Sequence, residues 1–147
     1  MLFPDIISAL GITEYPPLLE EIYNAGESVS DFTEETADML DREFLVIGDC
    51  KDKIISSYEN AKKNAALWEY TKSAAAFLSR VSFNEGANLL LPKTDDAYYP
   101  YLLLIMALPE AIKNYLRRGF SKAEVVDILS SFREAINTTT KKYNWLR

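Results

Sequence analysis

The stretch from residue 98 to residue 108 constrains the fold of this chain most strongly. It opens Tyr-Tyr-Pro and continues as an unbroken apolar run from Tyr101 to Leu108. A helix that is apolar on every side has to be surrounded by other elements. The run is also much shorter than the ~20 residues that a membrane-spanning helix needs. We therefore expect a central buried helix over about residues 97–118, with the other elements packed around it and no contact with a membrane.

A second long segment, residues 49–82, repeats apolar residues at helical spacing throughout. A straight helix of this length would extend about 51 Å. A compact chain of 147 residues has a radius of gyration of only about 15 Å. The segment therefore has to kink or break, and we expect the break between Asn60 and Ala66.

Further helices are expected on both sides of these two segments. Glycines are few and fall where helical patterns stop, and the alternation typical of strands is nearly absent. Ser121 followed by Glu124 has the spacing of a capping box that would open a last helix. The sequence thus predicts an all-α bundle of five to seven helices. We expect residues 1–147 to form a single domain, either complete or the N-terminal part of a longer protein.

The composition excludes several kinds of chemistry. The chain has no histidine and one cysteine, so it has no histidine-based catalytic triad, no histidine-ligated zinc site and no internal disulfide. No nucleophile stands in an evident pairing with a base. The N-terminus lacks the basic segment of a signal peptide. We expect a cytoplasmic chain that carries no metal and no cofactor of its own.

Charge is distributed unevenly along the chain, whose net charge is -6. Residues 1–60 carry 14 acidic and 3 basic side chains, and residues 61–147 carry 8 acidic and 13 basic ones. The overall acidity argues against a nucleic-acid partner. The basic half either attracts the acidic half within one fold or offers a face to an anionic ligand or a neighbouring domain.

The segment from residue 117 to residue 122 is the strongest candidate for such a face. Arg117 and Arg118 precede Gly119 and Phe120, and Lys122 follows close to the start of the last expected helix. Free N–H groups at a helix start favour anions. The plainer interpretation is a helix-to-helix turn, in which Gly119 takes a left-handed conformation and Phe120 folds back on the preceding turn.

An aromatic group forms a second candidate. Its members are spread over three expected helices and comprise Tyr98, Tyr101, Tyr115, Tyr143 and Trp145, with Tyr99 and Trp68 beside them. Aromatic residues at helical spacing are usually part of the core. The alternative is a groove for an apolar ligand or a partner helix.

Three short motifs together resemble a known family. They are Leu108-Pro109, Tyr115-x-x-Arg118-Gly119-Phe120 and Val126-Asp127-x-Leu129-x-x-Phe132. This pattern resembles the N-terminal helical domain of bacterial two-domain acyltransferases of the acetyltransferase-like (GNAT-like) type. The resemblance is clearest over residues 98–143. In residues 1–47, only Leu10-Gly11-Ile12 matches it.

The resemblance implies a non-catalytic accessory domain. Such a domain would pack against a following acyltransferase domain or shape its acceptor-substrate cleft, and acyl-CoA would bind to that second domain. Two other functions remain open. The first is a stand-alone helical module for protein–protein interaction, for example a homodimer that forms through the 125–145 face. The second is a small apolar-ligand binder that uses the tyrosine group.

Overall fold

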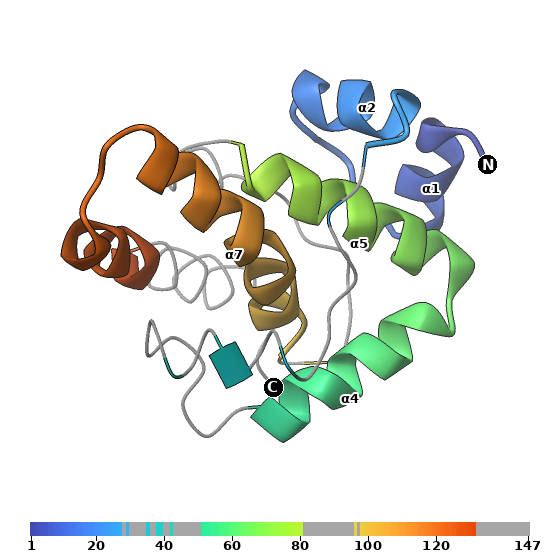
Figure 1. Cartoon of the computed structure of the whole chain (residues 1–147). Helices are drawn as coiled ribbons and strands as arrows, with labels where there is room; N and C mark the ends of the chain where they lie inside the picture. Colours follow the sequence, from blue (N-terminus) through green and yellow to red (C-terminus); the bar gives the residue numbers. More distant parts are fainter. Residues whose placement is uncertain are drawn as a thin grey trace.

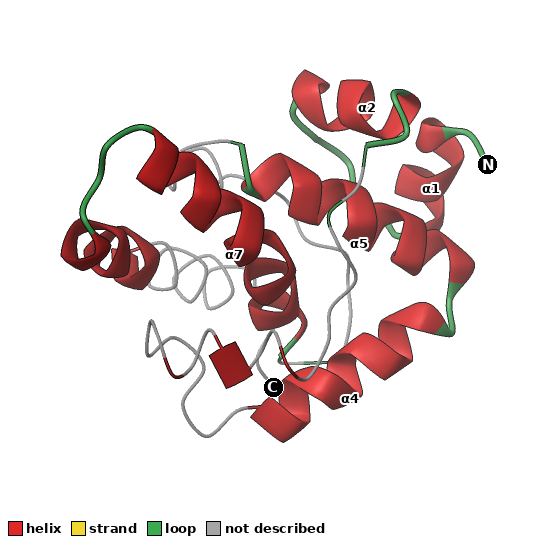
Figure 2. Cartoon of the chain, viewed as in Figure 1, coloured by secondary structure: helices red, strands yellow, loops and turns green. Residues whose placement is uncertain are grey.

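The computed structural model describes residues 1–27, 29, 35, 38–39, 42, 51–80, 96 and 98–131. Every regular element in these ranges is a helix, as Figure 2 shows. The expected all-α fold is therefore confirmed. Two of the aromatic candidates, Tyr143 and Trp145, lie outside the described residues.

The helices surround one central element. They are α1 (Phe3–Ala9), α2 (Pro17–Asn24), α4 (Lys51–Lys62), α5 (Ala65–Leu78) and α7 (Tyr99–Arg117), and residues 122–131 form a further helix. Figure 1 shows α7 between α5 and the helix over residues 122–131, with its first turns close to α4. The first two helices lie at one end of the molecule and residues 122–131 lie at the other.

The central position of α7 follows from its apolar first half. All seven residues from Leu102 to Leu108 are buried, as are Ala111 and Ile112 in its second half. This helix packs against both α5 and α4. It continues through Pro109 without interruption. The expectation of a central buried helix over about residues 97–118 is thus confirmed, with bounds that differ by one or two residues.

The long helical segment breaks within the expected interval. The α4 helix ends at Lys62, and α5 starts at Ala65 after a two-residue turn. Asn64 is the N-cap of α5: its backbone is extended, and its side-chain oxygen accepts a hydrogen bond from the Leu67 N–H at 3.1 Å. This bond satisfies an N–H group that a helix start otherwise leaves without a partner.

Small side chains let α5 approach its neighbours closely. Ala74, Ala75 and Ala76 are buried on this helix, which packs against α7, α2, α4 and α1.

Among the described residues, no helix is both long and apolar enough to pass through a lipid bilayer.

Candidate functional site

The motif that carries most of the family resemblance forms the end of α7. Gly119 has φ of +94°, its N–H donates to the Leu116 carbonyl, and the Phe120 N–H donates to the Tyr115 carbonyl. These two bonds define a Schellman motif, which requires a residue in the left-handed region. The rings of Tyr115 and Phe120 meet edge to face at 5.5 Å, which supplies the apolar contact typical of this motif. The predicted turn is confirmed.

Arg118 belongs to the same turn. Its guanidinium carbon lies 5.8 Å from the centre of the Tyr115 ring and 5.5 Å from the centre of the Phe120 ring. Both distances fall within the range of a cation–π contact. Arg118 therefore already has an intramolecular role, which is to cover two rings that a helix end has brought together.

The segment Leu10-Gly11-Ile12 forms the same structure at the end of α1. Gly11 has φ of +69°, its N–H donates to Ser8, and the Ile12 N–H donates to Ile7. Two segments that carry the resemblance to the acyltransferase family are thus the ends of α1 and α7. In both, the backbone conformation of a helix end favours the glycine that is present. General helix-end chemistry is sufficient to account for them.

The capping box predicted at Ser121 is present. The Ser121 N–H donates to a Glu124 carboxylate oxygen at 3.1 Å, and the Glu124 N–H donates to the Ser121 hydroxyl at 3.2 Å. The backbone N–H of Ser121, and then its hydroxyl, lower the pKa of the Glu124 carboxyl. Two of the N–H groups at this helix start, those of Ser121 and Glu124, are thus engaged by the capping box. The Glu124 carboxylate also places a negative charge there, which argues against an anion site.

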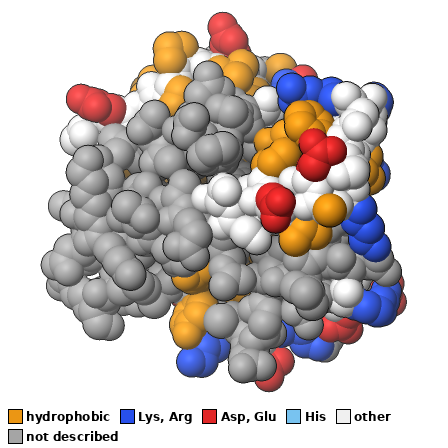
Figure 3. Space-filling model, turned by 90° about the vertical axis from the view of Figure 1, so that its left-hand side faces the viewer, with side chains coloured by type: hydrophobic (Ala, Val, Ile, Leu, Met, Phe, Trp, Pro, Cys, Tyr) orange, Lys and Arg blue, Asp and Glu red, His pale blue; other side chains and the backbone are white. Residues whose placement is uncertain are grey.

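Three side chains near the end of α7 are exposed to solvent. Leu116 is 46 % exposed. Lys113 lies three residues before Leu116 and four before Arg117, so it shares a helix face with each of them, and all three side chains are exposed. Arg117 makes one long hydrogen bond, at 3.5 Å, to Asn114. We call Lys113, Leu116 and Arg117 the α7-end surface. Figure 3 views this end of the molecule and shows hydrophobic side chains at the surface beside Lys and Arg side chains.

Tyr98 and Tyr101 lie at the opposite end of α7. Their rings are 6.0 Å apart, and the Lys53 ammonium lies 5.1 Å from the centre of the Tyr98 ring. Lys53 also donates to the Tyr98 hydroxyl at 3.2 Å. These contacts attach the start of α7 to α4.

The candidate residues therefore form two groups. Tyr98 and Tyr101 are one group, and Tyr115, Arg117, Arg118 and Lys122 are the other. The rise of an α-helix places Tyr101 and Tyr115 about 21 Å apart along α7. The structure does not bring the described tyrosines together into one groove.

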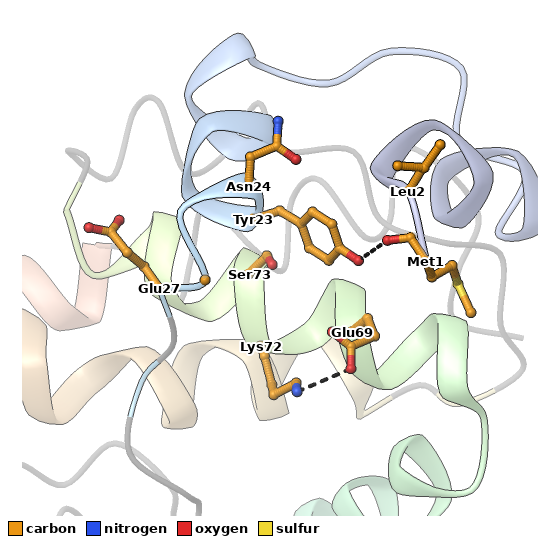
Figure 4. A pocket seen from close by; sticks show the side chains of 9 residues that line it. Met1, Leu2, Tyr23, Asn24, Glu27, Glu69, Lys72 and Ser73 are labelled. Carbon is orange, nitrogen blue, oxygen red and sulfur yellow. Dashed lines mark hydrogen bonds and ion pairs between the residues drawn. The ribbon is translucent and has the colours of Figure 1, made fainter.

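A hollow that the sequence did not predict lies between α1, α2 and α5. Its volume is about 370 Å³. Met1 and Leu2 form its apolar edge, and the Tyr23 ring lies beside them, as Figure 4 shows. The Tyr23 hydroxyl donates to the Met1 carbonyl, which holds the chain before α1 against α2.

Three residues of α5 form the polar side of this hollow. Glu69, Lys72 and Ser73 are three and four residues apart and therefore share one face of the helix. The Lys72 ammonium lies 3.2 Å from a Glu69 carboxylate oxygen. Asn24 and Glu27 line the hollow from the end of α2 and the turn that follows, and Glu27 pairs with Arg80 at 2.6 Å.

No sequence motif marks this hollow. Its residues are ordinary surface types from segments about 45 residues apart, and only the packing of α2 on α5 brings them together. Within the described residues, no group of three or more potential metal-ligating side chains occurs.

Comparisons with known protein families, with curated proteins and with solved structures find no match to this chain.

Proposed function

We propose that this chain is a non-catalytic helical domain that docks against another protein domain through the α7-end surface. The observation that carries the proposal is the exposure of Leu116 next to two exposed cations, Lys113 one turn earlier and Arg117 beside it in the sequence. An apolar side chain bordered by cations suits a partner surface that is apolar at its centre and acidic around it.

The state of Arg117 supports this role. Arg118 is packed over two rings, whereas Arg117 is exposed and, among the described residues, bonds only to Asn114 at long distance. Within this part of the chain, most donors of the Arg117 guanidinium are thus available to a partner. Arginine is also over-represented among the residues that dominate binding energy at interfaces.

The family resemblance suggests the identity of the partner. We propose a following acyltransferase-like domain, which would bind acyl-CoA and carry the catalytic residues, while this chain stabilises it or shapes its acceptor cleft. A bacterial, cytoplasmic protein is the setting that this proposal implies. A second copy of the chain is the alternative partner.

The first experiment is the intact mass of the polypeptide in the cells that make it. A mass far above 16.7 kDa, with acyltransferase-like sequence after residue 147, supports the proposed partner. The affinity between the 147-residue chain and the separately produced remainder is then measured by calorimetry. A mass near 16.7 kDa rejects the acyltransferase partner, and sedimentation of the chain at increasing concentration then tests the homodimer.

Charge reversal tests the α7-end surface, whether the partner is an acyltransferase-like domain or a second copy of the chain. Arg117→Glu should weaken association about tenfold or more, because it replaces a favourable charge contact with a repulsive one. Lys63→Glu is the matched control, since Lys63 is an exposed cation in the turn between α4 and α5, outside this surface. Arg117→Ala should change folding stability by less than about 0.5 kcal/mol. Equal weakening by the two charge reversals would reject the α7-end surface as the docking site.

A further inference from the structure

The hydroxyl of Ser73 opens into the hollow between α1, α2 and α5. Ser73 is 3 % exposed, and no hydrogen bond from its hydroxyl to any other described residue is present. Thr71 and Ser79 on the same segment behave differently, because each donates to a backbone carbonyl three or four residues earlier. Among the described residues, the fully enclosed side-chain oxygen without a partner belongs to Ser57, not to Ser73. The Ser73 oxygen is therefore reached from the hollow rather than sealed off. A ligand's polar group in the hollow would supply the partner that Ser73 lacks.

Opposite charges from the same helix line this hollow as well. Lys72 and Glu69 pair at 3.2 Å, and their side chains are 34 % and 38 % exposed. Ion pairs of this exposure contribute little to stability, so a ligand can replace either partner. Glu27 is engaged by Arg80 at 2.6 Å. Lys72 and Glu69 thus place one cation and one anion of α5 side by side, both partly exposed.

The opposite edge of the hollow is apolar. Met1 is 66 % exposed and Leu2 is 71 % exposed, and the Tyr23 ring adjoins them in Figure 4. Exposed apolar side chains at the rim of a polar hollow gain free energy when a ligand covers them. The volume of about 370 Å³ is at the small end of the range for small-molecule sites.

We propose that this hollow binds a zwitterionic amino compound, an amino acid or dipeptide with apolar side chains. The carboxylate of the ligand accepts hydrogen bonds from Lys72 and Ser73, and its ammonium donates to Glu69. Its apolar side chains cover Met1 and Leu2. A simple anion or cation would match only one of the two accessible charges, whereas a zwitterion matches both. This site is separate from the α7-end surface, so it does not depend on the docking proposal.

Calorimetric titration of the 147-residue chain with L-leucyl-L-leucine tests the site. Three related compounds each remove one feature of the ligand: the N-acetylated dipeptide lacks the ammonium, the dipeptide amide lacks the carboxylate, and glycylglycine lacks apolar side chains. Each should bind at least about fivefold more weakly than the parent dipeptide. Amide resonances of α5 and of the end of α2 should shift on titration.

Variants of α5 connect binding to the named groups. Lys72→Gln should weaken binding about tenfold or more, and Ser73→Ala should weaken it about fivefold. Lys63→Gln is the matched control, because Lys63 is an exposed cation in the turn before α5 and lies outside both the hollow and the α7-end surface. Its affinity should equal that of the unmodified chain.

Several results would overturn the proposal. One is the absence of any heat or resonance shift at millimolar dipeptide, and another is equal weakening by Lys72→Gln and Lys63→Gln. Equal affinity for the dipeptide and its amide would show a cation site, and equal affinity for the dipeptide and its N-acetyl form would show an anion site. Either of these outcomes rejects a zwitterion as the ligand.

Discussion

At the contact of α5 with α7, the hydroxyl groups of Thr71 and Tyr99 lie 2.7 Å apart in the core. Thr71 also donates to the Leu67 carbonyl at 2.6 Å. A threonine hydroxyl has a single hydrogen, so Tyr99 has to be the donor in the bond between the two side chains. The two residues are therefore unequal partners: Thr71 keeps its bond to Leu67 without Tyr99, whereas the phenol of Tyr99 depends on Thr71.

This inequality predicts different costs for two conservative substitutions. Thr71→Val leaves a buried phenol donor without its acceptor and should lower the free energy of unfolding by about 1–3 kcal/mol. Tyr99→Phe removes the donor itself and should lower it by about 0.5–1.5 kcal/mol. Urea unfolding measures both. The double variant should be more stable than Thr71→Val alone, and the opposite order would show that Thr71 is the donor to Tyr99.

Single residues were predictable where local geometry decides their conformation. Gly119 was expected to take a left-handed conformation because the residues around it fit a helix end, and its φ of +94° agrees. The bond between Thr71 and Tyr99 was not predictable. The two residues are 28 positions apart, and neither has a neighbour in the sequence that points to the other.

At the scale of the element, the capping box couples the helix over residues 122–131 to pH. The N–H and hydroxyl of Ser121 lower the pKa of Glu124, so the folded state holds that proton less tightly than the unfolded chain does. The stabilisation is present above the ordinary pKa of a glutamate. It is lost as the pH falls through the lower pKa of the folded state.

Glu124→Gln isolates this effect, because glutamine keeps the capping geometry and removes the charge. The chain should be more stable than this variant at neutral pH, and the difference should disappear as the pH falls through the acidic range. Denaturant unfolding at a series of pH values measures the difference. Ser130→Ala, at an exposed position of the same helix that does not titrate, is the control, and its difference from the parent chain should stay constant with pH. A Glu124→Gln difference that stays constant with pH would contradict the coupling.

The helix boundaries were largely predictable from the sequence because their causes are local. A capping box and the glycine that ends α7 each involve residues within a few positions of one another. The break between α4 and α5 followed from length alone, because an unbroken helix would be too long for a compact chain. The role of Asn64 as the cap was not singled out, since polar residues are frequent throughout this stretch.

At the scale of the whole molecule, the candidate residues were harder to predict. Helical spacing shows which residues share a face of one helix, but not which faces of different helices meet. The candidate tyrosines therefore look like one group in the sequence. In the structure, Tyr98 and Tyr101 lie at the start of α7 and Tyr115 lies near its end. The hollow beside α5 depends on how α1 and α2 pack, which no local pattern specifies.

The stability of the whole fold should fall at alkaline pH because two tyrosine side chains, Tyr70 and Tyr99, are buried. Burial raises the pKa of Tyr70, with a smaller contribution from Tyr99, and burial likewise raises the pKa of Tyr99 despite the bond to Thr71. Both side chains stay protonated in the folded state at a pH where the unfolded chain has begun to lose these protons. The sign is therefore opposite to that of Glu124: their contribution to stability is complete below about pH 10, the pKa of a free tyrosine, and is lost as the pH rises above it.

Each such phenol should lower the free energy of unfolding by about 1.4 kcal/mol for every pH unit above the pKa of a free tyrosine. Tyr99→Phe should therefore flatten the alkaline decline relative to the parent chain, although it is less stable at neutral pH. Leu102→Ala, at a fully buried position on α7 that does not titrate, is the control. It should lower stability by the same amount at every pH. Urea unfolding between neutral and strongly alkaline pH measures all three chains, and parallel declines would show that the phenol of Tyr99 ionises equally readily in the folded and unfolded states.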